Sequence, residues 1–293
     1  MERANRIKGY IFVIASAVIF GSMPLMSSFL YADGMNAISL VFLRNLMALP
    51  VLGVLALLTQ KTLRVPVKAL PSMGLIGVLG CCLTPLLLCG SYTRIASGTS
   101  TVFHFIYPAV VVLLGVIFLR ERVRAGNLLC ALICLVGICL FYTPGTALDP
   151  VGSVMALSSG VTYAIYILLL PRFRYHRITG FLFSFYVIGI STLIMGAVCL
   201  LSGQLALPGS WMGWGLCLVF ALTVTVGAVV LFQQGTFLIG AQHASILSTL
   251  EPITSIFLGV LVLGEPIGVL TIVGACLVIL ASILIAVFDG RKR

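Results

Sequence analysis

The sequence has very few acidic residues and little charge of either sign. Only seven of its 293 residues are Asp or Glu, and only 8% are charged, whereas a soluble globular chain carries about 25% charged residues. Hydrophobic residues make up 61% of the chain, and the mean hydropathy is +1.23. This composition excludes a soluble protein and indicates an integral membrane protein.

Motifs that would indicate catalysis or ATP-driven work are missing as well. The chain has no P-loop, no HExxH motif, and no cluster of nucleophile, base or metal ligands at one membrane depth. Its nine cysteines lie in apolar runs without metal-ligand spacing, which favours free packing thiols over disulfides. We therefore expect no enzyme, no cofactor and no metal, with a membrane enzyme or a sensor as the remote alternative.

Apolar runs long enough to cross a hydrocarbon core of about 30 Å fill most of the chain. They fall at about residues 9–30, 37–59, 71–92, 97–119, 126–143, 152–171, 179–202, 212–236, 243–263 and 267–288. The first run is too long for a signal peptide, so we expect it to be retained. The gaps leave no room for a soluble domain, so any function must lie within a bundle of ten helices.

The basic residues set the expected orientation. With a cytoplasmic N-terminus, fifteen of the seventeen Lys and Arg fall on the cytoplasmic side, while Arg94 lies in an outer loop and Arg44 lies within the second run. The positive-inside rule then predicts that both termini are cytoplasmic. Because the basic clusters flank apolar runs as anchors, the net charge of +10 does not indicate nucleic-acid binding.

The two halves of the chain share a repeated pattern. The segment "IASGTSTVFHFIYPAVVVLLGVIFLRE" (95–121) aligns without gaps with "IGAQHASILSTLEPITSIFLGVLVLGE" (239–265), at an offset of 144 residues. The Pro, Gly and Glu of a Pro–x6–Gly–x5–Glu frame recur in both copies. Fixed-offset self-similarity is the mark of an internal repeat, and we place its two copies at about 9–143 and 152–288.

The repeat is expected to be inverted. Five spans in each half is an odd number, so the second copy enters the membrane upside down. The loop charges agree, because "LRERVRAG" after the fourth run is basic and its counterpart "LGEPIGVL" has no Arg. Inverted repeats are typical of alternating-access transporters, which bind substrate near the midplane between the repeats.

These features resemble the drug/metabolite transporter superfamily, in its EamA-type branch with two EamA repeats. The resemblance rests on the two five-span halves, on Arg44 in "VFLRNLMALP", and on the repeated "P…LG…LGE". It implies peripheral fifth and tenth helices around an eight-helix cavity, and substrates such as amino acids, other small metabolites, sugar phosphates or nucleotide sugars. The usual Trp-Gly of the first and sixth spans is Phe20-Gly21 and Tyr163-Ala164 here, so the substrate need not match that of better-known members.

Ionisable residues within the expected spans are few, and buried ones are functional candidates by default. Glu251 lies about 12 Å from the inner end of its span and Arg44 about 12 Å from the outer end of its own, which leaves a vertical gap of roughly 6 Å. They are interpreted either as a structural ion pair, or as a site where Glu251 binds a substrate cation or proton and Arg44 faces a carboxylate or phosphate. Separate structural roles, with Arg44 snorkelling outward, form a third alternative.

The repeat predicts two polar stripes that face one cavity. His104 and Tyr107 are spaced i, i+3 and so share a helix face, as do their counterparts Ser248 and Glu251. A proline follows each stripe, and a proline that frees a carbonyl is tolerated in a membrane only where protein or water satisfies that group. Static kinks, and a hydrogen-bonded packing role for His104, are the alternatives. The expected hinge residues are Pro24, Pro85, Pro108 and Pro252.

Three further residues are weaker candidates for substrate binding. Tyr163 and Tyr166 share a face of the sixth span, where their rings could stack on an aromatic or heterocyclic substrate. Gln233 and Gln234 are adjacent and point in different directions, so at most one reaches the cavity, and we assign Gln234 to it.

The sequence thus predicts a secondary-active or facilitative transporter that exports small metabolites, such as amino acids, by alternating access. The alternative is a proton-coupled antiporter of lipophilic or aromatic cations, because a carboxyl group removed from water holds its proton more readily. The expected partners are a small-molecule substrate, the lipid bilayer and a second copy through the fifth and tenth helices. A compact multi-pass chain favours the bacterial inner membrane, and substrate, direction, coupling ion and oligomeric state are left open.

Overall fold

The computed structural model describes residues 2–95, 97–119, 125–140, 149–173, 178–263 and 268–290. Over these residues every regular element is helical and no strand occurs, so the all-helical class is confirmed. Within the described ranges, eight helical segments are long and apolar enough to cross a membrane: Ala4–Ala32, Ala37–Gln60, Val67–Ser91, Thr99–Phe118, Pro150–Phe173, Gly180–Ser202, Trp211–Ile239 and Ala241–Val262. The expected fifth and tenth spans correspond to α8 and α15, whose apolar stretches are shorter among the described residues, so ten spans stay a prediction.

In the first half, most spans consist of two helices joined by an irregular turn. Its elements are α1 (Glu2–Phe20), α2 (Met23–Ala32), α3 (Ala37–Gln60), the 3-10 turn Val67–Ala69, α4 (Leu70–Ile76), a π-helical segment (Gly77–Leu83), α5 (Thr84–Ser91), α6 (Ser97–His104), α7 (Tyr107–Leu119) and α8 (Ala125–Cys139). Each proline expected as a hinge in this half lies at one of these divisions or within two residues of it.

The second half repeats the order with fewer divisions. Its elements are α9 (Pro150–Leu169) with the 3-10 turn Leu170–Phe173, α10 (Gly180–Ser202), α11 (Trp211–Phe220), a π-helical segment (Ala221–Ala228), α12 (Val229–Ile239), α13 (Ala241–Leu247), the 3-10 turn Ser248–Leu250, α14 (Glu251–Leu263) and α15 (Val269–Gly290). Its first span is continuous through α9, where the first half breaks between α1 and α2.

The backbone irregularities obey the offset of 144 found in the sequence. The π-helical segments begin at Gly77 and Ala221, which are 144 residues apart. The fourth span breaks between His104 and Tyr107, and its counterpart has the 3-10 turn Ser248–Leu250 at the same register. The repeat therefore extends from sequence identity to helix geometry.

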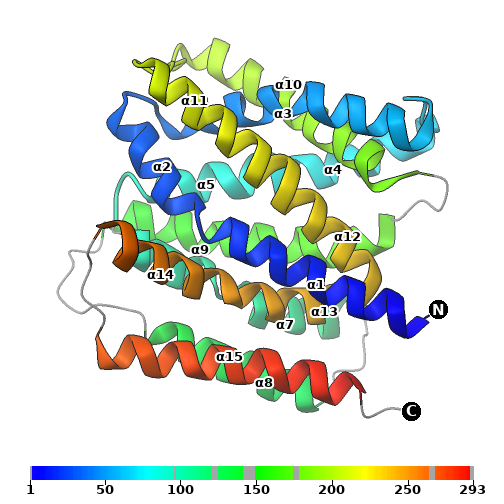
Figure 1. Ribbon diagram of the computed structural model, residues 1–293, viewed down its shortest axis with the longest axis vertical. Coiled ribbons are helices and arrows are strands. Elements are labelled where there is room, and N and C mark those ends of the chain that lie inside the picture. Colours follow the sequence, from blue (N-terminus) through cyan, green and yellow to red (C-terminus); the bar gives the residue numbers. More distant parts are fainter. Residues whose placement is uncertain are drawn as a thin grey trace.

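The main helix pairs join the two halves, and the repeat relates these pairs to one another. α3 packs against α10 and α8 packs against α15, while α1 packs against α12 in the way that α9 packs against α5. In Figure 1 these helices run side by side across the view, with α3 and α10 at the top and α8 and α15 at the bottom. The N-terminus and the end of α15 lie at the same side of the molecule.

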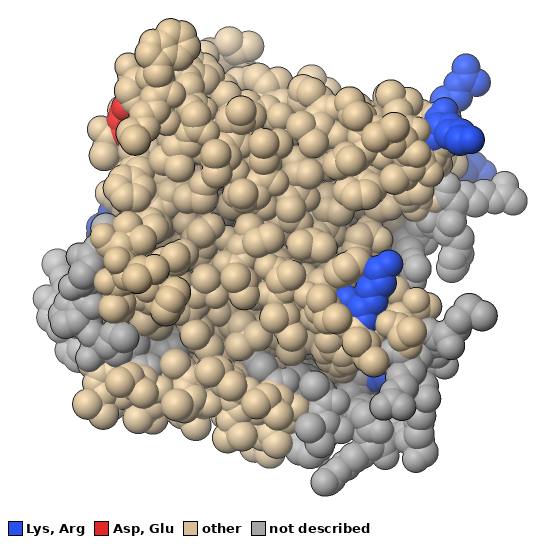
Figure 2. Space-filling view, viewed as in Figure 1, with Lys and Arg blue, Asp and Glu red and all other residues tan. Residues whose placement is uncertain are grey.

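The outward faces of the helices are apolar. Leu201 and Trp211 are 89% and 92% exposed, and Figure 2 shows a broad face without charged residues, with most visible Lys and Arg gathered toward one end. Large contiguous apolar surface is rare on monomeric soluble proteins, so this face fits a lipid environment.

Capping side chains and one ion pair organise the end of the molecule at which α2 ends and α11 begins. Asn36 accepts a hydrogen bond from the Ser39 amide (2.8 Å), which satisfies one free donor at the start of α3. Arg94, in the loop after α5, pairs with Asp149, the N-cap of α9, at 3.1 Å. That hydrogen bond, together with bonds from the α9 backbone amides, lowers the pKa of Asp149.

Candidate functional site

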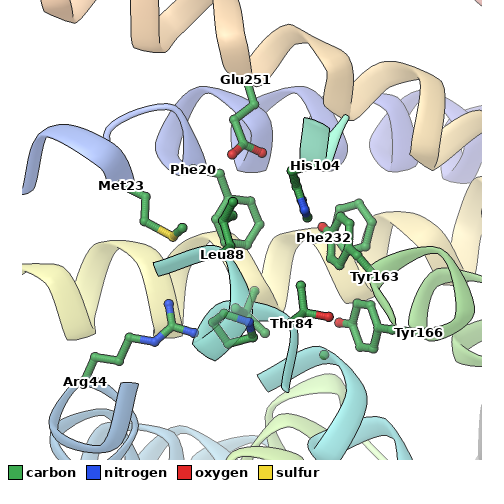
Figure 3. Close-up of a pocket in the computed structure, with 13 residues that line it drawn as sticks. Phe20, Met23, Arg44, Thr84, Leu88, His104, Tyr163, Tyr166, Phe232 and Glu251 are labelled. Carbon is green, nitrogen blue, oxygen red and sulfur yellow. The ribbon is translucent and has the colours of Figure 1, made fainter. Parts of the chain in front are cut away.

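A central cavity lies where the irregular segments of both halves meet (Figure 3). It is small, about 50 Å³ measured as the space open to the centres of water molecules, which is room for a few waters. Its lining residues are Phe20, Met23, Arg44, Gly80, Thr84, Pro85, Leu88, His104, Tyr163, Tyr166, Val229, Phe232 and Glu251. These come from both halves of the chain, so the cavity is an interface between the repeats.

Prolines create the helix breaks beside this cavity. α7 and α14 begin at Tyr107 and Glu251, and their second residues, Pro108 and Pro252, cannot donate a backbone hydrogen bond to the turn before them. Pro24 lies in the first turn of α2, just after the break at Gly21. All these prolines lie at irregular backbone, and a moving hinge at them stays a prediction.

The fourth expected hinge residue, Pro85, follows the π-helical segment of the third span. A helical residue at position 85 would donate its amide to the Cys81 carbonyl, and proline cannot. The Asn45 side chain donates to that carbonyl instead, at 3.0 Å, and also to Ser191 Oγ at 3.1 Å. Buried Asn45 therefore satisfies the group that Pro85 leaves free and joins α3 to the third span and α10.

Gly21, at the break between α1 and α2, allows that break to lie very close to the start of α14. A Cβ on Gly21 would lie 2.6 Å from the Glu251 carbonyl oxygen and 2.5 Å from Thr254 Cβ. Real Cβ atoms essentially never show contacts under 3.0 Å, so only glycine fits without a shift. The break between α1 and α2 thus sits directly against the start of α14, where Glu251 enters the cavity.

The two predicted polar stripes touch each other. Tyr107 Oη lies 2.6 Å from Ser248 Oγ, and Ser248 itself donates to the Ala244 carbonyl at 3.0 Å. We assign Tyr107 as the donor to Ser248 from this network. Both side chains are buried and stand one layer behind the cavity wall, so they position that wall rather than line it.

His104 reaches the cavity from the end of α6. Its Nδ1 lies 2.8 Å from Ser159 Oγ, and Ser159 donates to the Ala156 carbonyl at 2.6 Å. Because the Ser159 hydroxyl donates to that carbonyl, we assign Nδ1–H of His104 as the donor to Ser159 Oγ, and Nε2 is then the acceptor in the neutral form of the ring.

Stacked aromatic rings form one wall of the cavity. Tyr163 stacks on Tyr166 (centroids 5.6 Å apart, 16° between planes) and on Phe232 (5.6 Å, 28°). Tyr107 meets the edge of Tyr163 at 4.9 Å, and His104 lies at 5.4 Å from the same ring. This wall offers flat apolar faces and π-electron density to a ligand.

Arg44 is buried without an acidic partner in the described part of the chain. Its side chain is 3% exposed, its Nε has no hydrogen-bond partner there, and its guanidinium carbon lies 5.7 Å from the centre of the Phe220 ring. A guanidinium held inside a membrane protein is costly unless an anion or hydrogen bonds compensate it.

Glu251 approaches the same cavity from a different side. Figure 3 shows its carboxylate and the Arg44 guanidinium extending inward from α14 and α3, with Met23 and Leu88 in the region between them. Among the described residues no ion pair joins the two groups. The structural ion pair that the sequence allowed is therefore absent in this conformation, and each of the two groups lines the cavity separately.

The structure collects most, but not all, of the predicted site residues. Glu251, Arg44, His104, Tyr163 and Tyr166 line the cavity, with Tyr107 and Ser248 behind it.

Gln234 does not join this group: it lines a separate pocket beside Lys8, because successive helical residues point about 100° apart. Its neighbour Gln233 is buried and accepts a hydrogen bond from Ser184 (2.6 Å). The two aligned segments of the repeat end at Glu121 and Glu265, and both of these residues lie outside the described part of the chain.

The sequence did not single out several lining residues. Phe20 drew attention only because Phe20-Gly21 replaces the usual Trp-Gly of the family. Nothing in the sequence identified the further lining residues Met23, Thr84, Leu88, Val229 and Phe232. Apolar residues carry no individual signal in a chain that is 61% hydrophobic. In the part of the chain that the structure describes, no group of three or more His, Cys, Asp or Glu could hold a metal ion.

Comparisons with known proteins give a family for this chain and a solved structure that shares its fold. The model of the EamA-like transporter family matches residues 7–143 and 150–287, that is, once in each half. A crystal structure of another protein superposes with a TM-score of 0.76 over 97% of this chain and 98% of that one, at 16% identity, which indicates a shared fold.

Relatives of similar length carry transporter names. The uncharacterized transporter YcbK of Bacillus subtilis is 27% identical over 91% of this chain and 88% of its own. The uncharacterized inner membrane transporter YicL of Salmonella typhimurium is 27% identical over 98% and 97%. An uncharacterized transporter of Archaeoglobus fulgidus is 25% identical over 96% and 98%.

Proposed function

Because the chain belongs to the EamA-like transporter family, we propose that it exports a small zwitterionic metabolite, an amino acid or a close relative, through the central cavity. Glu251 binds the ammonium group and Arg44 binds the carboxylate. The observation that carries this proposal is the presence of a buried guanidinium and a buried carboxyl group at one cavity without an ion pair between them.

The case for an anionic group on the substrate rests on Arg44. Its Nε lacks a partner among the described residues, although the side chain is 97% buried. A guanidinium presents a fork of donors that matches a carboxylate or a phosphate. A substrate carboxylate would supply the counter-charge and the missing hydrogen bond together.

The case for a cationic group rests on Glu251 and on the aromatic wall. Glu251 is 9% exposed and lines the cavity, so an ammonium group there would meet a carboxylate that water scarcely reaches. Tyr163 lines the same cavity, and its π-electron density adds attraction for a cation. A zwitterion satisfies both ends at once, which a simple cation or a simple anion cannot.

Transport requires the cavity to change shape. The present volume of about 50 Å³ is well below the roughly 300–1,000 Å³ of ordinary ligand sites, so this conformation is too narrow to hold a substrate of ordinary size. In our proposal two inverted five-helix halves rock against each other around the cavity, with both termini cytoplasmic. The prolines at the helix breaks serve as the hinges of this motion.

A second candidate is proton-coupled efflux of lipophilic or aromatic cations. The stacked wall of Tyr163, Tyr166 and Phe232 favours it, since aromatic faces attract flat cations. Glu251 would then bind either the proton or the cation. The guanidinium of Arg44 on the same cavity opposes it by like-charge repulsion.

Thermal unfolding of the purified protein with three matched ligands separates these functions. The ligands are an amino acid, the amine that lacks its carboxylate, and the acid that lacks its amine. Wild type should be stabilised most by the amino acid, by about 2.7 kcal/mol at a hundredfold excess over Kd. Glu251→Gln should lose the preference for the amine group, and Arg44→Gln the preference for the carboxylate.

Other outcomes would redirect the proposal. Strongest stabilisation by the amine alone, lost in Glu251→Gln and kept in Arg44→Gln, would favour cation efflux. An amino-acid effect that survives both substitutions would remove the two charges from the binding site. Lys68→Gln changes an exposed basic residue and serves as the control for general charge effects.

A further inference from the structure

A second pocket lies apart from the central cavity, at the end of the molecule where α1 begins. It has a volume of about 460 Å³ and is lined by residues from the start of α1, the end of α3, the start of α10 and one face of α12. α1 and α3 belong to the first half of the chain, and α10 and α12 to the second. A ligand in this pocket would therefore contact both halves.

Three kinds of hydrogen-bond donor line this pocket. Lys8 lies at its edge, with its Nζ 5.3 Å from the centre of the Phe12 ring. The Nε2 of Gln234 is buried and has no partner among the described residues. The α10 amides of Gly180 and Phe181 are the first of that helix and lack intrahelical acceptors, and a helix N-terminus favours anions.

Gly180 brings two of these donors together. A Cβ at position 180 would overlap the side-chain amide of Gln234, whose nearest atom would be Nε2. The absence of a side chain therefore lets the Gln234 amide rest against the start of α10. This places the unpartnered Gln234 amide beside the first backbone donors of α10, which have no acceptor within the helix, and such an arrangement suits an anion.

The remainder of the pocket is apolar. Its other lining residues include Phe12, Phe181, Phe183, Val230 and Phe237. A free inorganic anion would gain nothing from these side chains, whereas an amphipathic anion would bury its chain against them. Exposed Lys61, Arg64 and Lys68 lie near the end of α3 that helps to form the pocket, and such basic clusters attract anionic lipids.

We propose that this pocket binds the phosphate headgroup of an anionic phospholipid, with an acyl chain along its phenylalanines. Lys8, the Gln234 amide and the first amides of α10 hold the phosphate. The lipid comes from the leaflet that borders this end of the molecule, and its contacts with both halves stabilise the conformation seen here. The site does not depend on the identity of the transported substrate.

The test is lipid binding by the purified full-length protein in detergent, measured by native mass spectrometry and by thermal unfolding. The probes are dioleoyl phosphatidylglycerol, dioleoyl phosphatidylcholine and inorganic phosphate. Wild type should retain and be stabilised by phosphatidylglycerol in preference to phosphatidylcholine. Lys8→Gln should weaken phosphatidylglycerol binding about fivefold, as expected for one basic residue near a lipid surface.

Two glycine variants provide a matched pair within α10. Gly180→Ala should displace the flexible Gln234 side chain and reduce the phosphatidylglycerol preference as Lys8→Gln does. Gly189→Ala meets only an ordinary contact, with Leu49 Cδ2 at 3.6 Å, and should leave the preference unchanged. Lys8 is exposed, so its substitution does not threaten folding and keeps the test valid if Gly180→Ala unfolds.

Three results would overturn the proposal. Equal losses in Lys8→Gln and in Lys68→Gln would show diffuse attraction to a basic surface. Equal stabilisation by inorganic phosphate would show a soluble-anion site. Equal binding of the two lipids by wild type would show no headgroup recognition.

Discussion

The guanidinium of Arg44 and the carboxylate of Glu251 share a cavity but do not neutralise each other. Within one folded chain, such an arrangement is less favourable than a direct ion pair or a pair of apolar residues. A substrate that carries both charges would offset this unfavourable free energy when it binds. The gain is larger the fewer partners each group has in the free protein. Substitution of either residue is therefore expected to weaken substrate binding without lowering the stability of the free protein.

Arg44→Met is predicted to leave the free energy of unfolding unchanged or to raise it, because it removes a buried charge that has no counter-charge in the described protein. The same substitution should weaken the affinity for a carboxylate-bearing ligand about 10- to 100-fold, the value of one charge-assisted hydrogen bond. Denaturation in detergent and ligand titration measure the two effects. A loss of several kcal/mol of stability would instead assign Arg44 a structural role.

How far the sequence could identify the site depended on residue type. Arg44, His104 and Glu251 were identifiable because ionisable residues within apolar spans are rare and expensive. Phe20 and Phe232 were not, since an aromatic residue among so many apolar ones is not distinctive. Gln234 was misplaced because the choice between adjacent glutamines depends on the rotation of α12, which only the packed helices determine.

At the scale of elements, irregular helix turns surround the cavity, and each requires a donor or a close contact to replace what regular helix would supply. The clearest case is the carbonyl of Cys81, which Pro85 cannot satisfy and the Asn45 side chain does. A buried carbonyl without a partner costs about 1–3 kcal/mol. Asn45 is therefore expected to fix the shape of the third span rather than to contact substrate.

This account predicts a specific coupling between Asn45 and Pro85. Asn45→Leu should destabilise the protein by about 1–3 kcal/mol, since it keeps the size of the side chain and removes the donor. Pro85→Ala restores a backbone amide that can reach the Cys81 carbonyl, so the double variant should recover part of the loss. Additive effects in a double-mutant cycle by chemical denaturation would contradict the coupling.

The register of these turns was the part of the element structure that sequence could anticipate. The offset that aligns Pro108 with Pro252 also aligns the two breaks and the two π-helical segments. The π-helical segments themselves were not predicted, because no residue in "GVLGCCL" or "ALTVTVGA" requires one. Contacts with α10 and α3 accompany them, and such contacts are tertiary information.

At the scale of the whole molecule, the two halves are joined by contacts at their ends as well as around the cavity. Arg94 and Asp149 form one such contact, between the loop after α5 and the start of α9. The pKa of Asp149 is lowered in the folded protein, mainly by the hydrogen bond from Arg94. A lowered pKa means that the carboxylate stabilises the fold above its ordinary value of 3.8 and loses this effect as pH falls through the lower folded value.

The stability difference between wild type and Asp149→Asn should therefore be constant near neutral pH and vanish in acid. Thermal unfolding between about pH 7 and pH 3 follows this difference. Arg94→Gln should show a smaller difference of the same sign, because the α9 amides would still hold the carboxylate. A difference that grows as pH falls would contradict the assignment.

The overall architecture was predictable because membrane spans require long apolar runs and because the repeat doubles every signal. The break between α1 and α2 has no counterpart in α9, and this asymmetry could be seen in the sequence only as an unmatched Pro24. α8 and α15 have apolar outer faces, and a homodimer that forms through these helices stays a proposal.

Flux across sealed proteoliposomes tests the central claim most directly. Vesicles containing purified wild type and loaded with an unlabelled amino acid should take up the same labelled compound by exchange. Arg44→Gln and Glu251→Gln should each abolish the exchange, while Lys68→Gln should retain it. Exchange that persists undiminished in both cavity variants, or its absence for folded wild type across amino acids of every side-chain class, would contradict the account.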